Sequence, residues 1–323
     1  MVPSLSVVIP VYNASLTLPD LISQLDPVLP ALTGTYEVIL VNDGSRDQSW
    51  ETICSLAERY SWVRGINLMR NYGQHNALLC GIRAARYEIA VTMDDDLQHP
   101  PQEISKLLTK LAEGYDVVYG TPIDEQHGLW RDLASQITKL VLQTAMGAQN
   151  ARKVSAFRAF RSEIRQAFAN YGGAFVMIDV LLTWGTTRFA STPVRVEARR
   201  QGKSNYTFSK LITLAFNLLT GFSILPLQLA SILGFASMLF GLCVLLYVVG
   251  FYIINGGSVP GFPFLASIIA IFSGVQLFAL GIIGEYLGRL FNRSLDQPAY
   301  TIRSQAYGLS VDKEPPADDK RSN

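Results

Sequence analysis

The sequence predicts an α/β protein, with a mainly parallel sheet in its amino-terminal part and a two-helix transmembrane hairpin in its carboxyl-terminal part. Two observations predict this architecture. Short apolar runs alternate with helical stretches from Leu5 to Gly120, which is the pattern of parallel strands joined by right-handed crossovers. No Asp, Glu, Lys, Arg or His occurs between Lys210 and Glu285, a gap that is typical of membrane spans.

The predicted strands are short, and several are followed directly by polar residues. In open α/β sheets ligands bind beyond the carboxyl ends of the strands, so these polar residues form the candidate site. Helix boundaries are also visible: Asp47 can cap the second helix, while Pro101 and Gly114 lie where the fourth begins and ends. The predicted strands are Leu5–Tyr12, Glu37–Asp43, Val63–Leu68, Glu88–Met93 and Asp116–Gly120, and the predicted helices are Leu16–Leu32, Asp47–Tyr60, Asn76–Ala85 and Pro101–Gly114.

The uncharged stretch contains two apolar segments, 227–254 and 264–283, and the second span is expected to extend to about 286. Each is long enough to cross a bilayer core of about 30 Å at about 1.5 Å per residue. The connecting loop carries no charge, so the positive-inside rule places both termini in the cytoplasm. We therefore expect a multi-pass protein of the inner (plasma) membrane whose α/β domain is cytoplasmic. The flanking basic residues are Arg195, Arg199, Arg200, Lys203 and Lys210 before the hairpin and Arg289, Arg293 and Arg303 after it.

The chain is expected to have four regions: an α/β domain over 1–200, an amphipathic juxtamembrane segment over 201–226, the hairpin over 227–290, and a cytoplasmic tail over 291–323 with a disordered end. The first residues contain no basic region before the first strand, so no cleaved signal peptide is expected. The three cysteines are scattered, which predicts neither a disulfide framework nor a zinc site.

Three consecutive acids, Asp94–Asp96, follow the fourth predicted strand. Side chains alternate along an extended chain, which would put Asp94 and Asp96 on one side and Asp95 on the other. Two carboxylates in an open site suit Mg²⁺ or Mn²⁺ bridging to a substrate diphosphate. The alternative is a solvated acidic turn, so the neighbouring motifs must decide.

A second candidate is Asp43, which follows the second strand. It is either a turn residue that stabilises Gly44 or a hydrogen-bond acceptor for a base or ribose. The sequence contains neither Gly-x-Gly-x-x-Gly after the first strand nor Gly-x-x-x-x-Gly-Lys-Ser/Thr, which argues against a dinucleotide site or a P-loop. A bound diphosphate would instead be neutralised by metal.

Together these motifs resemble the family 2 glycosyltransferases with a GT-A fold. The similarity is greatest to membrane-anchored enzymes that load a sugar onto a polyprenyl phosphate, such as bactoprenol glucosyltransferases, dolichyl-phosphate mannose synthase and undecaprenyl-phosphate aminoarabinose transferase. Five motifs in order carry it over about residues 4–303. They are Val8–Asn13, Val41–Ser45, Arg70–His75, Asp94–Pro101, and the hairpin signature of Ser223–Pro226 with Gly281–Arg289.

The resemblance implies inverting transfer of one sugar from a nucleotide-diphosphate sugar, with a UDP-sugar as the expected donor, to polyprenyl (undecaprenyl) phosphate for cell-envelope modification. It implies that Asp96 and Asp94 are the catalytic residues and the ligands of Mg²⁺ or Mn²⁺. The implied nucleotide-binding residues are Pro10, Val11, Tyr12, Asn13, Asp43, Asn71, Gly73, Asp94 and Asp95. The implied residues near the acceptor phosphate are Arg131, Arg152, Arg158, Arg199, Arg200, Lys203 and Ser204.

Three positions depart from the family pattern. Asp95 replaces a small apolar residue and is expected to point away from the metal, and Ala14 replaces a Glu. Relatives also carry an acid just upstream of the Phe157-Arg158 motif, where residues 151–156 contain none. Since a phosphate monoester with a second pKa near about 6 is already mostly dianionic at neutral pH, a general base has little proton to remove.

The missing acid leaves alternatives open. The chain could be a catalytically silent nucleotide-sugar-binding scaffold at the membrane, or a transferase to a different lipid acceptor. The expected partners are the sugar donor, the polyprenyl phosphate and membrane lipids, with no nucleic acid. The glycines at 281, 284 and 288 favour close helix packing, so a homo-oligomer through the hairpin is a further alternative.

Overall fold

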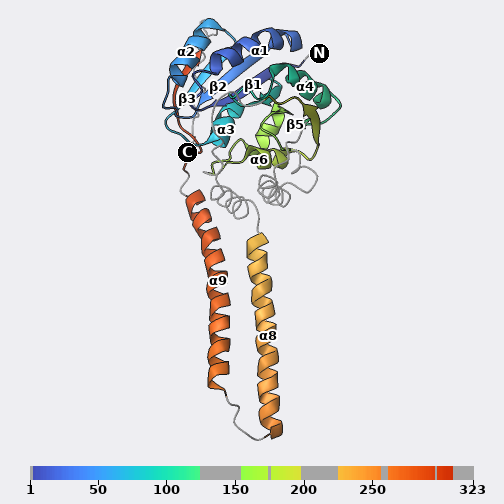
Figure 1. Ribbon diagram of the computed structural model, residues 1–323, viewed down its shortest axis with the longest axis vertical. Coiled ribbons are helices and arrows are strands. Elements are labelled where there is room, and N and C mark those ends of the chain that lie inside the picture. The colour runs from blue at the N-terminus through green and yellow to red at the C-terminus, as the bar shows by residue number, and fades with distance from the viewer. Residues whose placement is uncertain are drawn as a thin grey trace, which may run out of the picture. The chain divides into compact units, whose positions relative to one another are not determined.

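A computed structural model describes residues 3–123, 154–173, 176–197, 225–255, 261–294 and 297–307. The chain divides into two compact units. One comprises 1–131, 146–205 and 298–323, and the other comprises 132–145 and 206–297. The first unit contains an α/β sheet and the second contains two long helices (Figure 1).

The first unit is built on an eight-stranded sheet in the order β7-β5-β6-β4-β1-β2-β3-β8. Strand β1 pairs in parallel with β2 and β4, β2 with β3, and β5 with β7, whereas β6 and β8 run antiparallel to their neighbours. The predicted mainly parallel sheet is confirmed. The strands are β1 Leu5–Val11, β2 Tyr36–Asn42, β3 Val63–Leu68, β4 Ile89–Thr92, β5 Val117–Pro122, β6 Arg158–Arg161, β7 Phe189–Val194 and β8 Ile302–Tyr307.

Helices cover both faces of the sheet, so the strands are buried on both sides (Figure 1). Helices α1, α2 and α4 enclose one hydrophobic core with β1, and α3 and α6 enclose the other. The observed boundaries of α1 to α4 lie within two or three residues of those predicted, and α6 was not predicted. They are α1 Leu18–Leu32, α2 Ser49–Arg59, α3 Gln74–Ala84, α4 Ile104–Ala112 and α6 Ile178–Gly185, with short 3₁₀ helices at Pro101–Glu103 and Ser162–Phe168.

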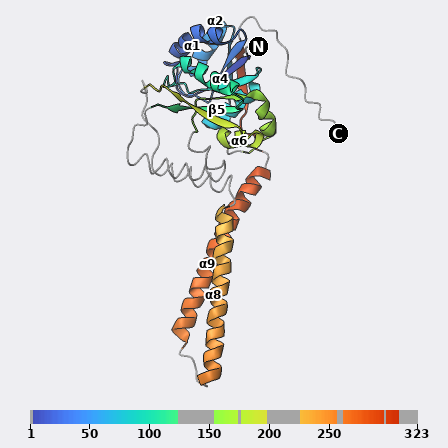
Figure 2. The ribbon, with the colours of Figure 1, turned by 90° about the vertical axis from the view of Figure 1, so that its right-hand side faces the viewer.

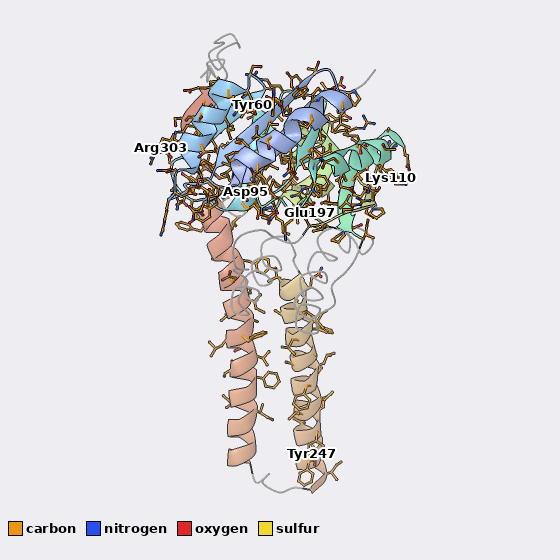
Figure 3. The ribbon with its side chains drawn as sticks, turned by 45° about the horizontal axis from the view of Figure 1, so that its top comes forward. Tyr60, Asp95, Lys110, Glu197, Tyr247 and Arg303 are labelled. Atoms are coloured by element: carbon orange, nitrogen blue, oxygen red, sulfur yellow. The ribbon has the colours of Figure 1, made fainter. Side chains whose placement is uncertain are left out.

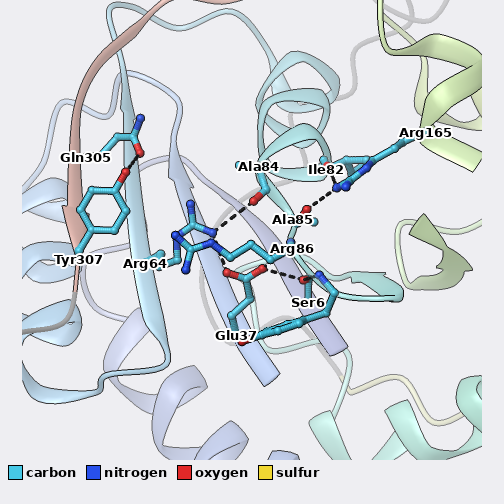
Figure 4. A network of polar contacts seen from close by, with 11 residues as sticks. Ser6, Glu37, Arg64, Ile82, Ala84, Ala85, Arg86, Arg165, Gln305 and Tyr307 are labelled. Atoms are coloured by element: carbon cyan, nitrogen blue, oxygen red, sulfur yellow. Dashed lines mark hydrogen bonds and ion pairs between the residues drawn. The ribbon is translucent and has the colours of Figure 1, made fainter. Parts of the chain in front are cut away.

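A buried polar network fixes the amino ends of the central strands (Figure 4). The Glu37 carboxylate on β2 pairs with the Arg64 guanidinium on β3 at 2.6 Å and accepts 2.8 Å hydrogen bonds from the Ser6 hydroxyl and the Arg86 backbone N–H. Buried charges are stable when they are paired and hydrogen-bonded in this way. Because the strands are parallel, their carboxyl ends meet at the opposite edge of the sheet.

Strand β8 corrects the prediction of a tail over 291–323. Helix α9 runs to Ser294, and Ile302–Tyr307 pairs with β3 at the end of the sheet. The Met69 N–H donates to the Thr301 carbonyl at 2.9 Å, and the Arg303 guanidinium donates to the Met69 carbonyl at 3.1 Å. The predicted disordered end, 312–323, lies outside the described residues.

The second unit contains helices α8, Leu225–Asn255, and α9, Phe262–Ser294, over the two predicted spans. They run side by side (Figure 2), with Gly241 of α8 against the Phe272 ring of α9. Among the described helices only α8, over Leu227–Phe251, is long and apolar enough to cross a membrane, and the apolar part of α9 is the shorter Phe272–Gly288. Apolar side chains are exposed along both helices (Figure 3). Residues 201–224 of the predicted juxtamembrane segment and the loop at 256–260 lie outside the described residues, and the last two residues of that segment belong to α8.

Candidate active site at the carboxyl edge of the sheet

The three acids that follow β4, Asp94–Asp96, form a turn in the structure, and we refer to them as the acidic turn. Leu97, which comes next, is buried and has a φ of +61°, a left-handed conformation that is uncommon for a residue with a side chain. The chain therefore bends sharply after the acids. All three residues are partly exposed.

Each carboxylate of the acidic turn accepts a hydrogen bond from a different segment. Asp94 is thereby joined to α3, Asp95 to the residue after β1 and Asp96 to its own loop. These contacts fix the direction of each side chain. Asp94 accepts from the Gln74 side-chain amide at 2.6 Å. Asp95 accepts from the Tyr12 backbone N–H at 3.1 Å, and Asp96 accepts from the Gln98 backbone N–H at 3.1 Å.

The middle acid, Asp95, has a strongly raised pKa. Desolvation raises the pKa of Asp95 to about 7; the Tyr12 N–H opposes this shift, and the neighbouring charges of Asp94 and Asp96 add to it. Like charges at this spacing repel one another, and a bound divalent cation would offset that repulsion. Asp95 accepts the hydrogen bond from Tyr12 at the end of β1, beside which the family resemblance predicts the nucleotide.

The loop that follows β1 is held to the loop that follows β2. Asn13 has a φ of +54°, its N–H donates to the Ser45 hydroxyl at 3.0 Å, and its side-chain carbonyl accepts from the Arg46 N–H at 2.8 Å. Ala14 is buried, and its N–H donates to the Ser49 hydroxyl at 2.9 Å. The neighbouring Tyr12 is 45% exposed, and its contact with the nucleotide stays a prediction.

Asp43 holds the loop that follows β3. It is only 3% exposed, and its two carboxylate oxygens accept from the backbone N–H groups of Tyr72 at 2.7 Å and Gly73 at 2.9 Å. Burial raises the pKa of Asp43, and these two N–H groups partly oppose the shift. Its role in the structure is therefore to position loop residues, and a contact with the nucleotide stays a prediction. Nearby Asn71 is exposed.

The helix that follows this loop pair does not begin as predicted. Gln48, rather than Asp47, is the residue before α2, but Asp47 still accepts from the Ser49 N–H at 3.1 Å and from its hydroxyl at 2.5 Å. Desolvation acts against the charged form, yet the hydrogen bonds from Ser49 and Ser15 hold the pKa of Asp47 below its usual value.

The structure corrects one predicted acceptor residue. Arg158 is 1% exposed, and its guanidinium is paired with Asp179 of α6 and donates to the Thr92 hydroxyl at 2.9 Å. A side chain held in this way is not available to a lipid phosphate. The other predicted acceptor residues, Arg131, Arg152, Arg199, Arg200, Lys203 and Ser204, lie outside the described residues.

Asp179 was missed by the sequence analysis. Its signal is a single acid inside the apolar run from Val176 to Leu182, where an unpaired charge would be costly. Tyr119 of β5 also donates to the Asp179 carboxylate, at 3.1 Å. The sequence gives no indication that the partner of Asp179 is the arginine of the Phe-Arg motif.

Two histidines near the site have protein neighbours of their own. The His99 ring stacks on Phe157 with 5.0 Å between ring centroids. The His75 Nδ1 accepts a hydrogen bond from the Ile178 N–H at 3.4 Å. These contacts give both rings a role in packing the site.

The acidic turn suits a divalent cation that takes only part of its ligands from protein. Within the described ranges, no three His, Cys, Asp or Glu side chains are grouped so that they could hold a metal by themselves. Asp94 and Asp96 offer partly exposed hard oxygen donors. Mg²⁺ and Mn²⁺ commonly bind through one or two carboxylates, with water and substrate phosphates completing the shell.

Comparison with solved structures identifies the fold. The crystal structure of glucosyl-3-phosphoglycerate synthase from Mycobacterium tuberculosis, in complex with Mn²⁺, uridine diphosphate and phosphoglyceric acid, matches with a TM-score of 0.51 and 19% identity. The match covers 68% of this chain and 76% of that chain. The α/β unit therefore has the fold of a solved glycosyltransferase, as predicted.

Comparison of sequences identifies the family. Residues 6–177 match the family described as Glycosyl transferase family 2. The undecaprenyl-phosphate 4-deoxy-4-formamido-L-arabinose transferase of Shewanella sediminis is 34% identical over 321 residues, 98% of this chain and 97% of that protein. The enzyme of the same name from Pseudomonas aeruginosa is 35% identical over 92% of this chain and 88% of its own length. The sequence motifs, the sheet and these relatives agree, and the chain belongs to glycosyl transferase family 2.

Proposed function

We propose that this glycosyltransferase moves one sugar from a nucleotide-diphosphate sugar to polyprenyl phosphate, with undecaprenyl phosphate as the acceptor. The observation that carries the proposal is the extent of the sequence match. The similarity to the Shewanella sediminis transferase spans 98% of this chain, so it includes the two long helices as well as the family domain at 6–177. The Mn²⁺ and uridine diphosphate in the Mycobacterium tuberculosis structure support a UDP-sugar donor and a divalent metal.

In this reaction an oxygen of the lipid phosphate attacks C1 of the sugar, and the bond between C1 and the nucleotide diphosphate breaks. Attack from the face opposite the leaving group inverts the configuration at C1. Asp96 and Asp94 would hold the metal, which neutralises charge on the departing diphosphate when it is bound. Pro10, Val11, Tyr12 and Asn13 would line the nucleotide side, with Asp95 behind them.

The acceptor needs no base from the protein, because its phosphate is already mostly a dianion at neutral pH with a second pKa near about 6. Basic residues would instead attract it. Arg131, Arg152, Arg199, Arg200 and Lys203, with Ser204, are the candidates that sequence and position supply. Each Lys or Arg near an anionic leaflet contributes about 1 kcal/mol to membrane association, so the same residues favour docking to the cytoplasmic face.

We propose further that α8 and α9 both cross the membrane as a hairpin. Helix α8 has a spanning length of apolar residues, and α9 has an apolar stretch that begins ten residues after its start and ends at Gly288. The arginines that follow, Arg289 and Arg293, favour a cytoplasmic end for α9.

The test uses membranes that contain the full chain. They are incubated with undecaprenyl phosphate, Mn²⁺ and a panel of UDP-, GDP- and dTDP-sugars, and lipid products are identified by mass spectrometry. We expect one glycosyl-phosphoryl-undecaprenol product that is absent with Asp96→Asn. Transfer to diacylglycerol but not to undecaprenyl phosphate would refute the acceptor, and nucleotide-sugar binding without any transfer would indicate a silent scaffold.

A further inference from the structure

Directly behind the acidic turn lies a buried charge pair that the proposed reaction does not use. The side chains of Arg158 on β6 and Asp179 on α6 are 1% and 5% exposed. Both charges are removed from water, and a buried ion pair of this kind is weak evidence for a stabilising role because desolvation can outweigh the attraction. A function in fixing geometry is the alternative, and it requires that the pair be connected to the site.

The pair is connected to the acidic turn through Thr92. The Arg158 Nε donates to the Thr92 hydroxyl at 2.9 Å, and that hydroxyl donates to the Ala156 carbonyl at 2.7 Å. Thr92 is the last residue of β4 and lies opposite Arg158 in the antiparallel register. Only Met93 separates it from the acids, so the guanidinium fixes the end of the strand from which the turn departs.

A second route joins the same helix to the same turn. The Ile178 N–H, next to Asp179 on α6, donates to His75 at 3.4 Å. The residue before His75, Gln74, donates its side-chain amide to Asp94 at 2.6 Å. The start of α6 is therefore linked to both neighbours of the acidic turn, to β4 through Arg158 and to the first turn of α3 through His75.

Electrostatics also couples the pair to the turn. Burial lowers the pKa of Arg158, but the charges of Asp179 and, to a smaller extent, Tyr119 and Asp94 outweigh it and keep the guanidinium charged. The Tyr119 hydroxyl, which donates to the Asp179 carboxylate, completes the hydrogen bonding on that side. The positive charge of the Arg158 guanidinium attracts Asp94 and so offsets part of the repulsion among the three carboxylates of the acidic turn.

We infer that Asp179 is a positioning residue, which acts through Arg158 and Thr92 to hold Asp94–Asp96 in the geometry that receives the divalent cation. The inference rests on the proposed function only in assigning that cation to the turn. Residues that orient metal ligands from behind commonly change metal affinity by about 10- to 100-fold when they are altered.

The decisive comparison is Thr92→Val against Thr92→Ser in the purified full chain. Valine removes the hydroxyl that links Arg158 to β4, whereas serine keeps it. With Thr92→Val we expect faster amide hydrogen exchange over 94–98 and a Mn²⁺ dissociation constant, measured by electron paramagnetic resonance without substrate, that is about tenfold higher. Thr92→Ser is expected to behave like the parent protein in both measurements.

Ser6→Ala is the matched control for general destabilisation, because it removes a buried hydroxyl from the network with Glu37 at the opposite edge of the sheet. It should lower the melting temperature without changing exchange at 94–98 or Mn²⁺ affinity. If Ser6→Ala speeds that exchange as much as Thr92→Val does, or if Thr92→Val leaves it unchanged, the inference is wrong.

A double variant, Arg158→Met with Asp179→Leu, tests the pair itself, since replacing a buried ion pair by apolar residues is commonly neutral for stability. A stable double variant with parental exchange and Mn²⁺ affinity would overturn the inference, and a stable one with a loosened turn would support it. If Thr92→Val or the double variant fails to fold, Tyr119→Phe replaces it, because this change removes the hydrogen bond from the Tyr119 hydroxyl to Asp179. Faster exchange over 94–98 and weaker Mn²⁺ binding in Tyr119→Phe would support the inference, and parental values would overturn it. A parent protein that binds no Mn²⁺ would refute the proposed metal, while the exchange rates still decide the positioning role.

Discussion

Replacing Gly44 by alanine should disrupt the active-site edge of the sheet. Gly44 has a φ of +63°, and a Cβ at this position would lie 2.5 Å from the backbone carbon of Arg70 and 2.5 Å from the backbone nitrogen of Asn71. The left-handed conformation costs about 1–2 kcal/mol for a residue with a side chain. Forcing packed atoms apart costs about 1–3 kcal/mol more. We therefore expect about 2–5 kcal/mol of destabilisation, or about 4–20 °C in melting temperature for a unit of this size.

The loop displaced by this Cβ carries the backbone N–H groups of Tyr72 and Gly73, which Asp43 binds. The Michaelis constant for the sugar donor should rise by about 10- to 100-fold, since small displacements at a positioned site have effects of that size. The constant for the lipid acceptor should change little. Melting curves of the purified protein and initial rates at varied donor concentration measure the two effects.

Two further variants separate strain from the close approach. Gly44→Asn introduces a side chain that tolerates the left-handed conformation, but it has the same Cβ as alanine. It should therefore be almost as destabilised as Gly44→Ala. Gly34→Ala is the control, because its Cβ would meet nothing within 4 Å, and it should change stability by less than about 1 kcal/mol. A stable Gly44→Asn variant with parental donor affinity would refute the steric argument.

Three other predictions follow from the site and the helices. Asp96→Asn should lower turnover at saturating Mn²⁺ by orders of magnitude at an unchanged melting temperature, and activity that persists in this variant and in EDTA would contradict the metal site. Desolvation lowers the pKa of His75, so the unfolded chain binds a proton that the folded chain does not; stability should therefore be full above the ordinary histidine pKa of about 6.5 and decline as pH falls below it. His75→Gln should flatten that decline in melting temperature. A reporter fused at Ser258 should lie outside the cytoplasm and one at the carboxyl terminus inside it, and a cytoplasmic Ser258 would exclude the hairpin.

The parts of the fold that sequence predicted are those with a local signal. Strands β1 to β5 are apolar runs, and the acidic turn begins two residues after the end of β4, so both were visible in the sequence. Strand β6 was not visible, because two of its four residues are Arg158 and Arg161. The charge of Arg158 can be buried only because it pairs with Asp179, which lies 21 residues away in the sequence. Strand β8 was missed because its alternating exposed residues carry no apolar run.

The sequence predicted which residues lie at the candidate site, but it did not predict their hydrogen-bond partners. Proximity in sequence could not show that Asp94 is bonded to Gln74 or Asp95 to Tyr12, which lie 20 and 83 residues away. It also could not show that Asp43 is occupied by two backbone N–H groups. Such partners depend on which strand ends become neighbours, and that order is set by the packing of the whole sheet.

The position of β8 has a consequence for how the protein is made. Strand β3 is buried along its whole length, yet its outer neighbour is synthesised more than two hundred residues later, after α8 and α9. Until Ile302–Tyr307 leaves the ribosome, β3 presents an unpaired apolar edge, the kind of surface that drives strands of separate chains to associate. Completion of the sheet must therefore wait until both long helices have been synthesised, and pairing over such a separation is slow. A soluble fragment that ends before α8 would keep that open edge, whereas one in which residues 297–307 are joined by a linker to residue 197 would close it.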